Sequence, residues 1–177
     1  DDFSSIVCGV EEGRVAYANV RKVIFLLVST GAAEIVLFLL SVGLGTPLPL
    51  LPVQLLWLNL VTNGIQDVAL AFEPAEGGEM SRPPRPPREP IFDRIMLVRC
   101  AVSALVMGLL AFAGFWAALR LGWPLDRIRN GTLLMMVLFE NVQAGNSRSE
   151  TQSVLRLSPL RNPLLLFGTI AALGLHV

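Results

Sequence analysis

Long apolar runs alternate with short polar segments along the chain, and one apolar run carries polar side chains in its middle. Residues 54–74, QLLWLNLVTNGIQDVALAFEP, make a run of roughly 20 residues, which is long enough to cross a bilayer as a helix. Inside it, polar side chains recur at steps of three and four residues, at Asn59, Thr62, Asn63, Gln66 and Asp67. On a helix these positions form one polar stripe.

A stripe that includes a carboxylate cannot face lipid. Polar groups at membrane depth face a bundle interior or a water-filled path, and they suggest function by default. Because glycine weakens a helix, we expect Gly64 to leave backbone carbonyls free to bind a ligand. Two alternatives stay open: the stripe only holds helices together through hydrogen bonds, or Asp67 lies at the membrane edge and pairs with a loop arginine.

The other apolar runs predict an all-α fold, a polytopic transmembrane helix bundle of four complete spans and a truncated fifth. The expected spans cover residues 23–44, 54–74, 95–119 and 131–147, and a fifth begins within 163–177. Residues 1–22 mix charged and apolar positions at roughly helical spacing. They predict a cytoplasmic stalk helix that leads into the membrane, with a disordered leader as the alternative. The expected organisation is therefore a hinge and stalk over 1–22 and a cation-transport domain over 23–177.

The loop over 74–94 contains five prolines between Pro83 and Pro90. Proline is incompatible with a helix interior and favours extended polyproline geometry. We expect a stiff connector at the membrane edge, and an SH3-type ligand is the alternative. In the span that follows, Gly108 and Gly114 interrupt an apolar sequence, which we assign to helix scaffolding.

Composition agrees with a membrane protein. Mean hydropathy is +0.61, with 53% hydrophobic and only 16% charged residues, which is typical of a multi-pass membrane protein and not of a soluble core. The formal net charge is zero, so charge gives no argument for a nucleic-acid partner. Cys8 and Cys100 belong to no metal-binding or disulfide pattern. The chain begins without Met and stops inside an apolar run, so we expect a piece of a longer protein.

The distribution of Lys and Arg predicts the topology. One set of loops holds 11 of the 14 basic residues. These are Arg14, Arg21, Lys22, Arg82, Arg85, Arg88, Arg94, Arg99, Arg148, Arg156 and Arg161. The other set holds Arg120, Arg127 and Arg129. The bias places the N-terminus and the proline-rich loop in the cytoplasm, and it places residues 45–52 and 120–130 outside, as in a multi-pass protein of the plasma membrane.

Three carboxylates lie within the expected spans, at Glu34, Asp67 and Glu140. Each costs on the order of 2–3 kcal/mol if it stays alone in lipid. The cheapest arrangement gathers them around a cation or keeps some of them protonated. Carboxylate, amide and hydroxyl oxygens are hard ligands that suit Ca²⁺, Mg²⁺, Mn²⁺ or alkali ions. A proton relay would use the same acids.

Several motifs together resemble one family. DDFSSIV, EEGR, YANVRK, PLPLLPVQLLWLNLVTNG, MSRPPRPPREPI and NSRSETQSVLR resemble the C-terminal membrane region of P-type cation-transporting ATPases, with the closest similarity to the calcium-pump-like branch. The resemblance implies that the chain holds the fifth to eighth transmembrane helices and part of the ninth, and that residues 1–22 form the stalk that couples ATP-driven motion to the ion site.

The resemblance also implies a ligand set. Glu34, Asn59, Thr62 and Glu140 match the family's cation ligands. Gly31 replaces the family's Asn on the fifth helix, and Asn63 replaces its Asp on the sixth. Asp67, one helical turn further toward the cytoplasm, has no counterpart in the calcium-pump pattern. The expected metal ligands are therefore Glu34, Asn59, Thr62, Asn63, Asp67 and Glu140, and the cargo is Ca²⁺ or another hard cation.

The sequence contains neither the DKTGT phosphorylation motif nor a nucleotide-binding domain. We expect ATP and Mg²⁺ to act only in a full-length parent, and the chain to be inactive alone. The partners implied are the lipid bilayer and the parent's N-terminal cytoplasmic domains and first four transmembrane helices. The alternatives are a fragment of a channel or secondary transporter that is not an enzyme, and a structural membrane subunit.

Overall fold

The computed structural model describes residues 3–81, 83, 86, 90–150, 152 and 154–175, and all regular structure within these ranges is helical. The all-α prediction is confirmed. The longer elements are α1 (Phe3–Gly43), α2 (Pro52–Trp57), the π-helix η1 (Leu58–Asn63), α3 (Gly64–Ala71), α4 (Arg94–Arg120), α5 (Leu125–Ser147) and α6 (Pro163–Gly174). Three short 3₁₀ turns, η2 (Glu79–Ser81), η3 (Val154–Arg156) and η4 (Pro159–Arg161), lie in the connections.

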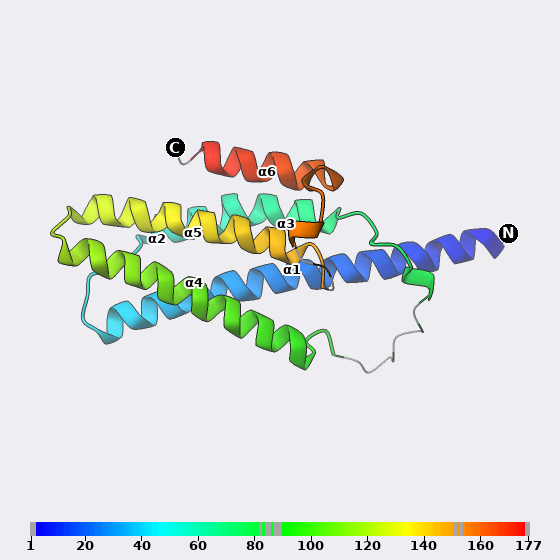
Figure 1. Cartoon of the computed structure of the whole chain (residues 1–177), viewed down its shortest axis with the longest axis horizontal. Coiled ribbons are helices and arrows are strands. Elements are labelled where there is room, and N and C mark those ends of the chain that lie inside the picture. Colours follow the sequence, from blue (N-terminus) through cyan, green and yellow to red (C-terminus); the bar gives the residue numbers. More distant parts are fainter. Residues whose placement is uncertain are drawn as a thin grey trace.

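The helices form an elongated up-and-down bundle. Figure 1 shows α1 running away from the N-terminus, the α2–η1–α3 segment returning beside it, and α4 and α5 repeating this antiparallel course. The turns after α1 and α4 lie together at one end, and the connections that follow α3 and α5 lie toward the other. The loops that the distribution of Lys and Arg assigns to the same side of the membrane therefore lie at the same end of the bundle.

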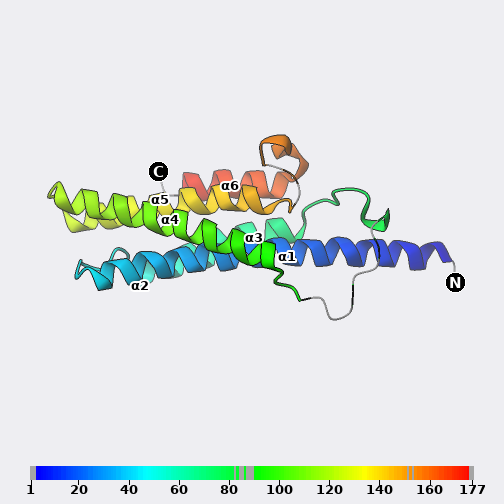
Figure 2. The ribbon, with the colours of Figure 1, turned by 60° about the horizontal axis from the view of Figure 1, so that its bottom comes forward.

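The expected stalk and first span are one continuous helix. α1 has 41 residues and no break at residue 22. At about 1.5 Å per residue it is roughly 60 Å long, twice the ~30 Å hydrocarbon core of a bilayer. Its N-terminal part extends beyond the rest of the bundle in both views (Figures 1 and 2). α1 is therefore about twice as long as a membrane crossing requires.

Two helices of the described residues, α1 and α4, are long and apolar enough to cross a membrane by length and composition, and α6 is a shorter apolar helix. This is fewer than the four complete spans expected. The difference has a physical reason. The second expected span is divided into α2, η1 and α3, and α5 carries polar residues that lower its hydropathy, such as Glu140, Asn141 and Gln143.

α1 and α4 approach closely at Gly108. A Cβ atom built on this glycine would lie 2.7 Å from the Val36 side chain and 2.8 Å from the Ala33 carbonyl oxygen of α1. The neighbouring residues Ala33 and Ala111 belong to the central hydrophobic core. The small residues thus let the two backbones meet, and the core fills the space on either side.

Ion pairs and hydrogen bonds join the N-terminal end of α4 to α1. The Arg21 guanidinium is 2.7 Å from Asp93 and 2.7 Å from Glu150, and it also donates to the Ile91 carbonyl. Asp93 is the N-cap of α4 and accepts a hydrogen bond from the Met96 amide. That amide and the Arg21 guanidinium hold the pKa of Asp93 below its ordinary value. α1 is therefore tied to the start of α4 and to the segment after α5.

The predicted polyproline geometry falls on the proline-rich loop, where residues 82, 84, 85 and 87–89 lie outside the described residues. His176 and Val177 lie outside them as well. The extended conformation of the loop stays a prediction.

The close approach at Gly108 predicts opposite effects for two Gly→Ala substitutions. Gly108→Ala should lower the free energy of unfolding by about 1–3 kcal/mol because the added methyl group meets backbone and cannot be accommodated. Gly131→Ala should raise it by about 0.5–1 kcal/mol, since alanine favours helix and a Cβ there meets nothing within 4 Å. Thermal unfolding in detergent measures both. Equal effects would contradict the close α1–α4 contact.

Candidate functional site

A π-helix interrupts the polar stripe. Residues Leu58–Asn63 form η1, and Gly64 follows with ordinary helical backbone angles of φ −57° and ψ −41°. The irregularity expected at Gly64 therefore lies in the turn before it, and the glycine itself opens α3. π-bulges insert one extra residue into a helix and often occur at functional sites. Asn59, Thr62 and Asn63, three of the predicted ligands, belong to this π-helix.

Glu34 and Asn59 form a pair between α1 and η1. The Asn59 amide nitrogen lies 3.1 Å from each carboxylate oxygen of Glu34, and it donates a further hydrogen bond to the Leu55 carbonyl at 3.0 Å. Asn59 is exposed and Glu34 is half-buried in the bundle. A Cβ atom at Gly31, one turn before Glu34, would meet nothing within 4 Å. This pair therefore borders open space.

A second group lies between η1, α3 and α5 and is buried. Thr62, Asn63, Gln66 and Glu140 are each 0% exposed. Among the described residues, eight buried side-chain nitrogen and oxygen atoms have no hydrogen-bond partner, and all eight come from this region. They are Thr62 Oγ1, Asn63 Oδ1 and Nδ2, Gln66 Oε1, Asp67 Oδ1, Glu140 Oε1 and Oε2, and Asn141 Nδ2. Each such atom costs about 1–3 kcal/mol if nothing satisfies it.

The Thr62 hydroxyl in the π-helix differs from other threonine hydroxyls of the bundle in its hydrogen bonding. Thr30 and Thr132 donate to the carbonyls of Leu26 and Ile128, four residues earlier, at 3.0 and 2.8 Å. This is the usual bond of a helical threonine. Thr62 makes no such bond. Its hydroxyl thus stays available inside the bundle.

The acids of the two groups face one another. Glu140 interacts electrostatically with both Glu34 and Asp67, and within the described part of the chain none of the three forms an ion pair. The alternative in which Asp67 pairs with a loop arginine is therefore not found there. Like charges close together in a bundle interior are unfavourable unless a proton or a cation lies between them.

The three carboxylates alone do not form a metal-binding group. Over the residues that the structure describes, no three His, Cys, Asp or Glu side chains are placed to hold a metal ion. The candidate donors are therefore mixed, with carboxylate, amide and hydroxyl oxygens side by side. Such a set can coordinate a hard cation or pass a proton.

A comparison with known families bears on this arrangement. A family model described as "Cation transporting ATPase, C-terminus" matches residues 47–177. The chain belongs to this family. The cation-transporting ATPase chain is accordingly part of a cation pump, a membrane protein that moves a cation. The match includes η1, α3 and α5 and leaves out α1, so it bears directly on the buried group.

A buried salt bridge in this ATPase chain was not predicted from the sequence. Arg148 lies 2.9 Å from Glu73, and these side chains are 6% and 2% exposed. The Asn162 amide, which begins α6, donates to the same carboxylate at 2.6 Å and to the Ala69 carbonyl at 2.8 Å. No local pattern in the sequence pairs Glu73 with Arg148, because the two residues are 75 positions apart.

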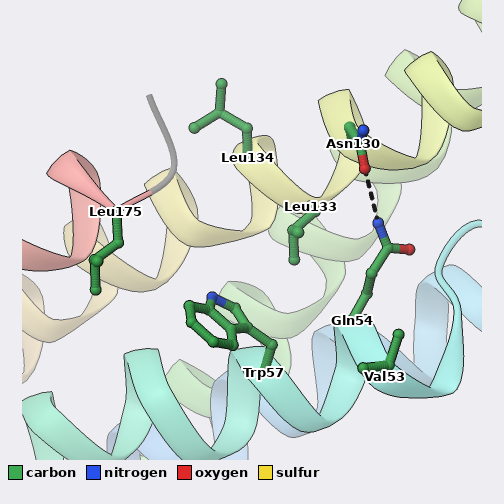
Figure 3. Close-up of a pocket in the computed structure, with 7 residues that line it drawn as sticks. All are labelled: Val53, Gln54, Trp57, Asn130, Leu133, Leu134 and Leu175. Atoms are coloured by element: carbon green, nitrogen blue, oxygen red, sulfur yellow. Dashed lines mark hydrogen bonds between the residues drawn. The ribbon is translucent and has the colours of Figure 1, made fainter.

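The ATPase chain also has a groove at the opposite end of α5. Figure 3 shows it between α2, α5 and Leu175, just after α6, with Trp57, Leu133 and Leu134 in its lining. Gln54 bridges it with a hydrogen bond of 3.1 Å to Asn130. Its volume is about 420 Å³. None of the predicted cation ligands lines this groove, so it is separate from the candidate site.

The buried salt bridge makes a stability prediction. Glu73→Ala should lower the free energy of unfolding by about 3–5 kcal/mol, because it leaves the Arg148 guanidinium buried without its counter-charge. The double substitution Glu73→Met/Arg148→Met should recover most of this loss. Glu150→Ala, which removes a half-exposed partner of Arg21, is the control and should cost at most about 1 kcal/mol. Thermal unfolding in detergent gives the comparison, and a single variant as stable as the control would contradict it.

Proposed function

We propose that this chain supplies the transmembrane helices that bind and translocate the cation in an ATP-driven pump. The ligands are Glu34, Asn59, Thr62, Asn63, Asp67 and Glu140. The observation that carries the proposal is the group of unpartnered buried polar atoms between η1, α3 and α5. Four of the six ligands contribute atoms to this group, and Asn59, which binds Glu34 of α1, lies on the neighbouring turn of η1.

A purely structural role for these residues explains the pattern less well. Amides that only hold helices together find partners in this bundle. The Gln143 amide donates to Ser29 on α1 at 2.9 Å, and Asn162 donates twice near the start of α6. The atoms near Asn63 and Glu140 are as deeply buried but have no partners. A cation supplies what carboxylate, carbonyl and hydroxyl oxygens need.

The donor set favours a hard cation. All the candidate oxygens belong to carboxylates, amides and a hydroxyl, and sulfur ligands are absent from the proposed set. Asn63 offers an oxygen without charge, while Asp67, four residues later, restores one negative charge on the same face of α3. Ca²⁺ or another hard cation is the proposed cargo. In the parent pump, ATP and Mg²⁺ supply the phosphoryl transfer that drives the cycle.

We infer a membrane arrangement of four complete spans and the start of a fifth. α2, η1 and α3 follow one another without a gap over 52–71. At about 1.5 Å per residue this is roughly 30 Å, a bilayer's hydrocarbon thickness. α5 is 23 residues long. Residues 1–22 form the cytoplasmic stalk of a transport domain over 23–177 in a plasma membrane, beside the parent's first four transmembrane helices and cytoplasmic domains.

The proposed site predicts the effect of neutralising Asp67. In the full-length pump, Asp67→Asn should raise the cation concentration for half-maximal phosphorylation from ATP about tenfold or more, a change of about 1.4 kcal/mol per factor of ten. The loss follows from removing one negative charge from the ligand set. Asp126→Asn is the control, because Asp126 is exposed at the opposite end of α5, and it should leave the value unchanged. Normal cation dependence in both Asp67→Asn and Asn63→Ala would exclude α3 from the site.

The arrangement of spans predicts sidedness. In a Cys8→Ser background, which removes the exposed native thiol, Pro47→Cys and Met80→Cys place one exposed cysteine at each end of the bundle. In sealed right-side-out vesicles, an impermeant maleimide should label the thiol at position 47 and leave the thiol at position 80 unlabelled until the vesicles are opened. Native Cys8, tested in the unmodified protein, should behave like position 80. Labelling of positions 47 and 80 from the same side would contradict the topology.

A further inference from the structure

The structure carries a further inference about Gln66, a residue of the stripe that is outside the ligand set above. We propose that the Gln66 carbonyl oxygen is an additional ligand of the transported cation, and that Asn141 is the positioning residue that turns this oxygen toward the site. The inference rests on the proposed function and adds to it one neutral ligand from α3 and its support from α5.

The hydrogen bond between the two amides fixes the orientation of Gln66. Its Nε2 donates to Asn141 Oδ1 at 2.5 Å. The two terminal atoms of an amide lie on opposite sides of the carbonyl carbon. With the nitrogen bound to α5, the oxygen points away from Asn141. That oxygen is buried and has no partner.

The free oxygen belongs to the same face as the proposed ligands. Asn63, Gln66 and Asp67 stand at positions i, i+3 and i+4, which are neighbours on a helix surface. On α5, Glu140 directly precedes Asn141, the residue that binds Gln66. Asn63, Asp67 and Glu140 each carry buried oxygen atoms that lack a hydrogen-bond partner. Gln66 thus adds its oxygen to an existing group of oxygens.

Two further bonds hold α3 and α5 in register on either side of this bridge. Gln54 binds Asn130 before it, and Glu73 binds Arg148 after it. The partners are 76 residues apart at the first bond and 75 apart at both Gln66–Asn141 and Glu73–Arg148. The segment from α2 to α3 therefore contains one more residue than α5 between the first two bonds. The π-helix η1 lies in that interval, and one extra residue is what a π-bulge inserts.

This register explains why Gln66 meets Asn141. One residue of an α-helix corresponds to a rotation of about 100° about the helix axis. In a regular α-helix, the extra residue of the α2–η1–α3 segment would therefore rotate Asn63, Gln66 and Asp67 by about 100° relative to α5. The wider turn of the π-helix absorbs this residue, so the three side chains keep their orientation toward α5. It allows the amide bridge and the Glu73–Arg148 bridge to form together, and it leaves Thr62 with its free hydroxyl on the same side.

A neutral oxygen suits the chemistry of the site. Ca²⁺ takes six to eight oxygen ligands, and proteins commonly use Asn and Gln carbonyls among them. The proposed set already holds three carboxylates, and another charge would increase their mutual repulsion whenever the cation leaves. An amide oxygen raises the coordination number without that penalty. The Gln143–Ser29 bond offers a comparison, because Gln143 is a buried amide of α5 that leaves no buried atom unpartnered among the described residues.

Equilibrium binding of Ca²⁺, Mn²⁺, Mg²⁺ and Na⁺ to the purified full-length pump, measured without ATP, tests the inference. Gln66→Leu should weaken binding of the preferred cation about 10-fold or more, because it removes the oxygen at nearly constant volume. Asn141→Leu should weaken it about 10-fold, as loss of an orienting residue does at other metal sites. Asn141→Asp keeps the acceptor oxygen for Gln66 and should recover most of the affinity. Gln143→Leu is the matched control and should change the affinity less than about twofold.

A second variant separates ligation from packing. Gln66→Glu keeps an oxygen and adds a charge, so it should tighten binding of divalent cations relative to Na⁺, opposite in direction to Gln66→Leu. Melting temperatures of all variants report folding. If wild type binds a cation and both Gln66 variants bind it with unchanged affinity and selectivity, the inference is wrong while the proposed function stands. If wild type binds none of the four cations, the proposed function itself fails and the inference fails with it.

Discussion

A helix inside a bilayer has no water to satisfy its polar side chains, so each polar group needs a protein partner, a proton or an ion. Most of this bundle meets that constraint with protein partners. Serine and threonine hydroxyls of α1 and α5 bind carbonyls of their own helices, and Glu73 receives both Arg148 and Asn162. Where η1 and α3 face α5, eight buried polar atoms of the described residues have no such partner. The cation proposed above would meet the constraint there without fixing the atoms to one another.

The same constraint explains why the register of two helices matters more here than their exact lengths. Three polar bonds join the α2–η1–α3 segment to α5, and the middle and last of them keep one spacing. A one-residue error would move a buried glutamine and a buried glutamate away from their partners. Each unpaired group would cost on the order of 1–3 kcal/mol, and more for the charged one. The π-helix thus accommodates the extra residue of the α2–η1–α3 segment, so that all three polar bonds to α5 can form.

Much of this architecture follows from the sequence. Periodicity predicted the helices and the polar stripe, and Glu34, one of the three carboxylates expected within the spans, is bonded to Asn59 of the stripe. The π-helix was not predictable, because the polar residues recur at steps of three and four residues both inside it and after it, as they would on a regular α-helix. Glu73 and Arg148 escaped because their partners are 75 residues apart, and no local pattern pairs them. The sequence placed three acids within the spans but not their neighbours: Glu34 is bonded to Asn59 on the α1 side, whereas Glu140 belongs to the buried group with Thr62, Asn63 and Gln66.

This separation makes the two halves of the proposed site physically different. The group around Asn63, Gln66 and Glu140 is closed between α3 and α5 and has 0% exposure. Asn59 is exposed, and the carboxylate of Glu34 is held by that single amide. A carboxylate at membrane depth cannot face lipid at low cost, so this side of the bundle requires a protein cover.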